Sequence, residues 1–74
     1  MKSRHTTLRE RAMQMVQQFQ PHGLTPDQVA IFLSESVLAV RPRLTELLNA
    51  GRVKRSGERR LNRTGKSAHV LVEA

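Results

Sequence analysis

Seven cationic side chains fall within residues 52–66 of this 74-residue sequence, and their chemistry suits the binding of a polyanion. They are Arg52, Lys54, Arg55, Arg59, Arg60, Arg63 and Lys66. Glu58 is the one acidic residue of the segment, which therefore has a net charge of +6, whereas residues 1–51 have a net charge of +2. Solubilising surface charge is usually mixed in sign, so a focused patch of one sign favours a nucleic acid.

A second set of polar side chains lies just before this segment, in the stretch Val37–Gly51, which is predicted to be helical. Its apolar residues repeat at i, i+4, i+7 and i+8 and therefore share one helical face. They are Val40, Leu44, Leu47 and Leu48. The opposite face is short-chained and polar with basic edges, and it holds Arg41, Pro42, Arg43, Thr45, Glu46 and Asn49. Such a face fits the major groove of DNA.

Pro42 restricts where this helix can begin. A proline in a helix interior loses a hydrogen bond, but the first four N–H groups of a helix have no partner within it. We therefore expect the helix to begin near Leu38 or Ala39, and Gly51 to end it in the left-handed conformation. Leu44 is central to the apolar stripe and should be buried.

Other kinds of chemistry have little support in the sequence. Gly65-Lys66-Ser67 is similar to the end of a phosphate-binding loop, but Arg60 stands where that motif requires its first glycine. The three histidines lack metal-ligand spacing, cysteine is absent, and no serine has an evident base beside it. We therefore expect no enzyme activity, no metal or other cofactor and no small-molecule ligand. Trp and Tyr are also absent, which favours duplex DNA over stacking on single strands or RNA.

Two further helices are expected before the stretch Val37–Gly51. The first has Thr6 or Thr7 as N-cap, with Glu10 at capping-box distance from Thr7, and runs to about Phe19. Met13 falls off its apolar stripe. The predicted core face is Leu8, Ala12, Met15, Val16 and Phe19.

The second helix is expected over about Pro26–Leu33, with Thr25 as N-cap and Gln28 completing a capping box. Its predicted buried residues are Val29, Ala30, Phe32 and Leu33. Ile31 should be exposed and, together with Met13, suggests a self-association surface. The turn Ser34–Val37 lacks the glycine that helix-turn-helix turns often contain.

The periodicity after Gly51 changes to that of a β-hairpin. Residues 52–55 alternate in polarity, Ser56-Gly57 indicates a bulge, and Arg59–Leu61 resumes the extended chain. The sequence Asn62-Arg63-Thr64-Gly65 is typical of a type I turn. In the second strand Ala68, Val70 and Val72 should be buried, alternating with exposed His69 and Leu71.

Length and composition indicate the number of domains and the expected location of the protein. Met1–His5 should be a flexible basic arm, and residues 6–74 a single small domain. No apolar run is long enough to cross a bilayer and no secretory segment is evident, so a cytoplasmic protein is expected.

The order of helix, helix-turn-helix and basic hairpin resembles the winged-helix DNA-binding proteins over Thr6–Val72. The resembling residues are LTPDQVAIFL, VRPRLTELLNAGRVKRSGERR and NRTGKSAHVLV, and the likeness is strongest to small winged-helix proteins of phages and prophages. The run RLTELLNAGRVKRSG is also similar to the segment from recognition helix into wing of MarR-type regulators, whose additional dimerisation helices are absent here. The resemblance implies an α+β, mostly α, fold in which three helices are followed by a two-stranded wing.

The function expected from this resemblance is sequence-preferring binding of double-stranded DNA, as in a phage or bacterial transcriptional regulator, with a homodimer as the natural assembly. The recognition-helix residues are Ala39, Arg41, Pro42, Arg43, Thr45 and Asn49. The wing residues are Lys54, Arg55, Arg59, Arg60, Arg63 and Lys66. The alternative is a protein-interaction module, such as a phage-encoded inhibitor or adaptor of a host complex.

Overall fold

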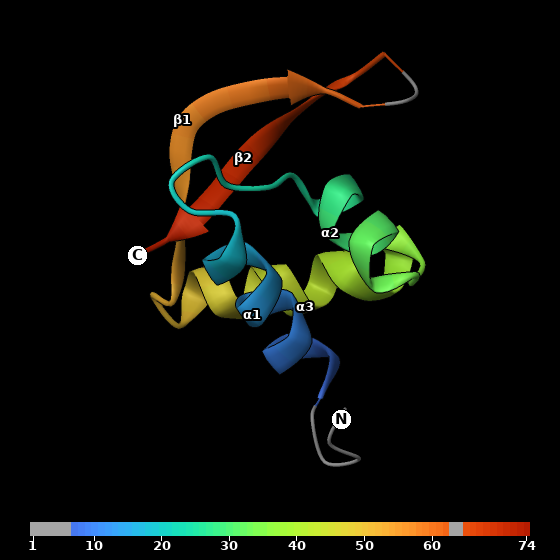
Figure 1. Cartoon of the computed structure of the whole chain (residues 1–74), viewed down its shortest axis with the longest axis vertical. Coiled ribbons are helices and arrows are strands. Elements are labelled where there is room, and N and C mark those ends of the chain that lie inside the picture. Colours follow the sequence, from blue (N-terminus) through green and yellow to red (C-terminus); the bar gives the residue numbers. More distant parts are fainter. Residues whose placement is uncertain (1–6, 63–64) are drawn as a thin grey trace.

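The computed structural model describes residues 7–62 and 65–74, which form three helices followed by a two-stranded antiparallel hairpin (Figure 1). The elements are α1 (Leu8–Gln18), α2 (Pro26–Leu33), α3 (Val37–Asn49), β1 (Val53–Leu61) and β2 (Ser67–Glu73). The predicted α+β fold class is confirmed, and the order of elements is consistent with winged-helix topology. The expected arm Met1–His5, together with Arg63, lies outside the described residues.

Both predicted capping boxes are present. The Thr7 hydroxyl accepts a hydrogen bond from the Glu10 N–H at 3.1 Å, and the Thr25 hydroxyl accepts one from the Gln28 N–H at 3.2 Å. In each box the side-chain oxygen of Glu10 or Gln28 in turn accepts a hydrogen bond from the N–H of the cap residue. The turn after α2 forms without a glycine because Ser34 itself adopts the left-handed conformation, at φ 56°. These caps fix where α1 begins and where α2 begins and ends.

Helix α3 begins earlier than its proline suggests. Ser36 is the N-cap and Val37 the first helical residue, whereas the sequence predicted a start near Leu38 or Ala39. The Ser36 hydroxyl accepts the Leu38 N–H at 3.1 Å, and this capping bond favours the earlier start. Pro42 therefore lies beyond the first turn, and α3 lacks the hydrogen bond that a residue 42 N–H would donate to the Leu38 carbonyl.

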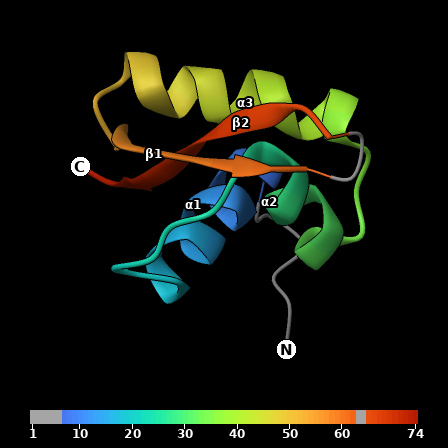
Figure 2. The ribbon, with the colours of Figure 1, turned by 90° about the horizontal axis from the view of Figure 1, so that it is seen from above.

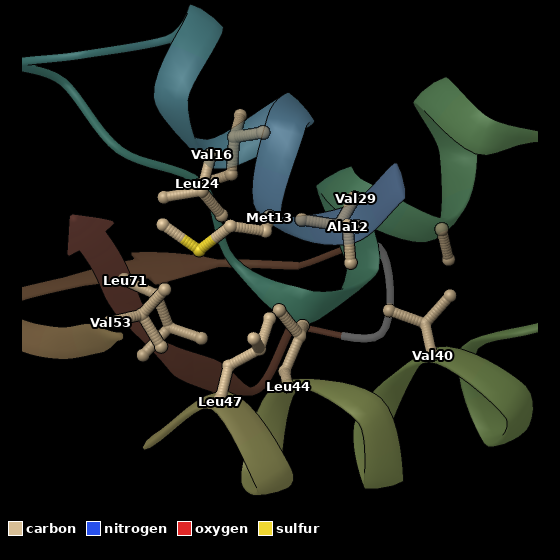
Figure 3. Packing of buried hydrophobic residues seen from close by; sticks show 11 residues of the cluster. Ala12, Met13, Val16, Leu24, Val29, Val40, Leu44, Leu47, Val53 and Leu71 are labelled. Carbon is tan, nitrogen blue, oxygen red and sulfur yellow. The ribbon is translucent and has the colours of Figure 1, made fainter. Parts of the chain in front are cut away.

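The hydrophobic core lies where α1, α2, α3 and the base of the hairpin meet, and it confirms the predicted stripe of α3 (Figure 3). Leu44 is 1% exposed, Val40 and Leu47 are buried, and Leu48 packs at the edge. From α1 and α2 the core includes Ala12, Val16, Val29 and Ala30, as predicted.

Three burial predictions were wrong. Met13 is 4% exposed and points toward the same cluster as Leu44 and Leu47, because α1 packs against α3 and β2 as well as α2 and so buries a wide arc (Figure 3). Phe32 is 50% exposed and stacks on Phe19 at the edge of the domain, with ring centroids 4.9 Å apart. Leu71 is buried, since its face of β2 turns toward the core. Ile31 is exposed as expected, but the buried Met13 cannot share a surface with it.

The connection between α1 and α2 is attached to the hairpin by its backbone. Leu24 and Leu71 exchange two hydrogen bonds, of 3.0 and 2.8 Å, so this connection pairs with the outer edge of β2. Gly23 lies so close to β2 that a Cβ there would meet the Leu71 carbonyl oxygen and the Val70 and Val72 side chains. Val70 is consequently buried on the face of β2 opposite to Leu71.

Candidate nucleic-acid interface

The register of the hairpin divides its cationic residues between two faces. Arg55 pairs with Leu71 and Arg59 pairs with His69, with the predicted bulge between them. Residues directly opposite each other in an antiparallel pair share a face, so Arg55 and Arg59 lie on the Leu71 face, toward α3. Lys54 pairs with Val72 and Arg60 with Ala68, which puts both on the other face. We call these the α3 face and the loop face of the hairpin.

A groove of about 310 Å³ runs between α3 and the α3 face of the hairpin. Arg41, Thr45 and Leu48 line it from α3, and Arg55, Ser67 and His69 line it from the hairpin. No carboxylate lines the groove among the described residues. Sequence analysis had identified Arg41, Thr45 and Arg55 but not Ser67 or His69, because only the strand register shows that the latter two face α3.

The two arginines of α3 differ in how far they are free to reach a ligand. Arg41 is 59% exposed in its side chain and lies 3.9 Å from Asp27, a loose ion pair. Arg43 lies on the other side of α3, where its guanidinium is 2.7 Å from the Glu46 carboxylate. Glu46 also lies 3.7 Å from Arg9 of α1, so two cations offset this carboxylate on the side of α3 that faces α1. Arg41 is therefore the better placed of the two to contact a polyanion beside the groove.

Arg60 points into the body of the domain. Its guanidinium donates to the carbonyl oxygens of His22 and Gly23, at 2.8 and 3.0 Å, and to the side-chain oxygen of Gln28 at 3.1 Å. Its Nε donates to Glu58 at 3.1 Å. The bonds to His22 and Gly23 attach β1 to the connection between α1 and α2, and the bond to Gln28 attaches it to α2. The charge pattern of the sequence predicted Arg60 as a wing contact, but its donors are engaged in holding the hairpin to the helices.

The remaining predicted positions are exposed. On α3 these are Ala39, Pro42 and Asn49, which lie on the side away from the core. On the hairpin Arg59 and Lys66 are exposed, the latter beside the turn that a Gly65 N–H to Asn62 carbonyl bond closes at 3.0 Å. Arg55 and Arg59 form no ion pair with any acidic residue in the described part of the chain.

A second groove, of about 520 Å³, lies between α1 and α3 on the other side of α3. Met13 and Leu47 contribute apolar surface to it, while Glu10 and Glu46 contribute carboxylates opposite Arg9 and Arg52. This mixed lining contrasts with the groove beside the hairpin. The charged residues that line this second groove balance one another, whereas those of the first groove are cationic, so the first groove suits a polyanion better.

The described residues hold no group of three or more His, Asp or Glu side chains placed to bind a metal ion. Within those same residues, no helix has the length and apolar character to cross a membrane. None of the protein-family models, curated proteins or solved structures compared with this chain matches it.

Proposed function

We propose that this protein binds duplex DNA with a preference for sequence, as a transcriptional regulator of phage or bacterial type. Helix α3 enters the major groove, and the α3 face of the hairpin follows the adjoining sugar–phosphate backbone. The observation that carries the proposal is the groove beside the hairpin, which is lined by Arg41 and Arg55 and by no carboxylate among the described residues.

Each part of this surface has a separate role in the proposal. Arg55 and Arg59 lie on the same face of the hairpin and neutralise phosphates, which adds affinity without sequence information. Thr45 and Asn49 are exposed on α3 and have the hydrogen-bonding groups to contact base edges. Arg41 lies between the two sets, at the wall of the groove, and contacts either a guanine or a phosphate.

A homodimer on a two-fold-related site is part of the same proposal. One module of 74 residues contacts few base pairs, so its specificity is limited, and two copies on symmetric half-sites multiply it. Ile31 and Phe32, both about half exposed at the end of α2, provide apolar surface for such a contact.

The second candidate function is that of a protein-interaction module, and the same two residues favour it. Ile31 and Phe32 are large apolar side chains on one short helix, and neighbouring exposed apolar residues are a feature of protein contact surfaces. Under this alternative the partner is another protein, such as a component of a host complex, and the hairpin charge is not used for DNA.

Salt-dependent binding to random duplex DNA separates the two functions. DNA binding predicts strong retention at low salt, with the logarithm of the association constant falling linearly as the logarithm of salt concentration rises. Fluorescence anisotropy at several salt concentrations gives this slope. No retention at low salt would contradict DNA binding and leave the protein-interaction module.

Matched alanine variants test which face of the hairpin contacts DNA. Arg55→Ala and Arg59→Ala should each reduce the salt slope by about 1 for the phosphate contact that is lost. Lys54→Ala is the control, since it removes an equal charge from the loop face of the same strand. Equal effects of all three variants would show that the charge acts diffusely, and would contradict the assignment of the α3 face.

A further inference from the structure

An outward stripe of α3 changes from apolar to polar along its length. Leu38, Pro42, Thr45 and Asn49 are spaced at i, i+4, i+7 and i+11, so they lie in one row along the helix. All four are exposed, and the core residues of α3 lie on the other side. Leu38 and Pro42 make the N-terminal half of the row apolar, whereas Thr45 and Asn49 make the C-terminal half polar.

Leu38 is the most exposed of the large hydrophobic residues in the described part of the chain, at 78%. Its main chain belongs to the N-cap of α3, where its N–H donates to the Ser36 hydroxyl at 3.1 Å. The neighbouring Ala39 is also exposed and extends the apolar end of the row. The first turn of α3 thus presents an apolar surface that no described residue covers.

The arrangement of the molecule directs this apolar end toward a DNA ligand. Figures 1 and 2 show that the N-terminal end of α3 and the turn end of the hairpin lie at the same end of the molecule. In helix-turn-helix docking the N-terminal residues of the recognition helix contact base edges. Leu38 and Ala39 occupy that part of α3, which is therefore the part that reaches deepest into a major groove.

The apolar group that unmodified DNA presents in its major groove is the 5-methyl group of thymine. We propose that Leu38 determines sequence preference by packing against a thymine methyl group, with Ala39 and Pro42 completing the apolar contact. The inference rests on the proposed function, and it names the base that the N-terminal end of α3 selects. Thr45 and Asn49 then form hydrogen bonds with bases further along the site.

Deoxyuridine provides a direct test, because it pairs with adenine as thymine does but lacks the methyl group. A preferred site is first selected from a random pool of unmodified duplex DNA. Each thymine of that site is then replaced in turn by deoxyuridine, and the dissociation constant is measured. At one or two positions we expect binding of the wild-type protein to weaken about fourfold, which corresponds to one buried methyl group.

Leu38→Ala should weaken binding to the thymine duplex to a similar degree and should abolish the further loss on deoxyuridine replacement. This non-additivity is the signature of a direct contact in a double-mutant cycle. Leu38 lies outside the core, so the variant is expected to fold. The matched control is Leu61→Ala, which removes a leucine of nearly equal exposure from the hairpin, and it should keep the full sensitivity to deoxyuridine.

The outcomes distinguish this inference from the proposed function on which it rests. Absence of salt-dependent DNA binding would overturn both. Sequence-preferring binding that is indifferent to deoxyuridine, or a Leu38→Ala variant that remains as sensitive as the wild type, would overturn the thymine contact and leave DNA binding intact. A uniform weakening on all duplexes by Leu38→Ala would also overturn it, since a base contact acts on the preferred site.

Discussion

Arg59 and Arg60 are neighbours in β1, yet the two faces of the hairpin give them opposite surroundings. Arg59 lies on the α3 face, is exposed and pairs across the strands with His69. Arg60 lies on the loop face and donates four hydrogen bonds to Glu58, Gln28 and the carbonyls of His22 and Gly23. The same kind of side chain therefore stabilises the fold on one face and remains available to a ligand on the other. A count of basic residues therefore overestimates the cations that are free to contact a polyanion.

The loop face also shows how the hairpin is held against the rest of the domain. Gly23 packs directly on β2, and Leu24 pairs with Leu71 through two backbone hydrogen bonds. The α3 face borders the groove instead, and its outer positions are exposed. Substitutions on the loop face should therefore change stability, and substitutions on the α3 face should change binding.

Gly23→Ala is expected to have the largest effect on stability. Its positive φ of +76° is unfavourable for alanine, and the new Cβ would lie 2.7 Å from a Val72 methyl carbon and 2.8 Å from one of Val70. We expect the free energy of unfolding to fall by about 2–5 kcal/mol, the sum of a left-handed backbone penalty and overpacking. Chemical denaturation measures the loss.

Gly51→Ala is the matched control for Gly23→Ala. Gly51 has a nearly equal φ of +74°, but nothing lies within 4 Å of the Cβ position. This variant should lose about 1–2 kcal/mol from the backbone penalty alone. Equal losses in the two variants would contradict the close packing of the α1–α2 connection on β2.

Arg60→Ala should have the next largest effect. Three acceptors on the α1–α2 connection and α2 lose their donor, but the side chain is 27% exposed, so water replaces part of the lost bonding. We expect a loss of about 1–2 kcal/mol in the free energy of unfolding and an unchanged salt slope for DNA binding.

Arg59→Ala should have the opposite pair of effects. Its free energy of unfolding should stay within about 0.5 kcal/mol of the wild type, and its salt slope for DNA binding should be smaller. If Arg60→Ala lowered the salt slope and left the free energy of unfolding unchanged, the division into a stabilising loop face and a DNA-binding α3 face would be contradicted.

The smallest expected effect is a pH dependence of stability that arises outside the hairpin, at the N-terminus of α1. All the hairpin variants should share this pH dependence. The Glu10 carboxylate accepts hydrogen bonds from the Thr7 N–H and hydroxyl, and these hold the pKa of Glu10 below its ordinary value of 4.5. Because the folded pKa is lowered, this stabilisation is complete above the unfolded pKa and is lost as the pH falls through the folded value. Glu10→Gln should remove that part of the pH dependence. Denaturation from pH 6 to pH 3 measures it, and unchanged acid sensitivity in the variant would contradict the assignment to Glu10.

Local patterns in the sequence predicted most of the fold. Thr7 with Glu10 and Thr25 with Gln28 give two capping boxes, the leucine spacing gives the core face of α3, and Ser56-Gly57 marks the bulge. Each of these features depends on residues within a few positions of one another. Short-range interactions of this kind can be predicted from a single sequence.

The errors arose where burial depends on contacts between distant segments. Met13 is buried because α1 packs against α3 and β2 as well as α2, and Leu71 is buried because its strand face turns to the core. The candidate site was likewise predictable where it depends on nearby residues and not where it depends on distant ones. Exposed α3 positions such as Thr45 and Asn49 were predictable from helical periodicity, but the engagement of Arg60 joins residues 37 and 38 positions apart, and the groove position of His69 depends on strand register. Leu38 was missed because the helix was expected to start at or after it, and the cap at Ser36 places it on the outer row.

The backbone pairing of Leu24 with Leu71 has a consequence for how the protein could be retargeted. The hairpin is held against the α1–α2 connection and α2 by main-chain atoms, by Gly23 and by Arg60, and none of these belongs to the surface proposed to contact DNA. Side chains at Leu38, Thr45 and Asn49 can therefore be exchanged without altering the scaffold that positions them. Binding preference and folding are thus separately adjustable in this domain, by substitution at largely different positions.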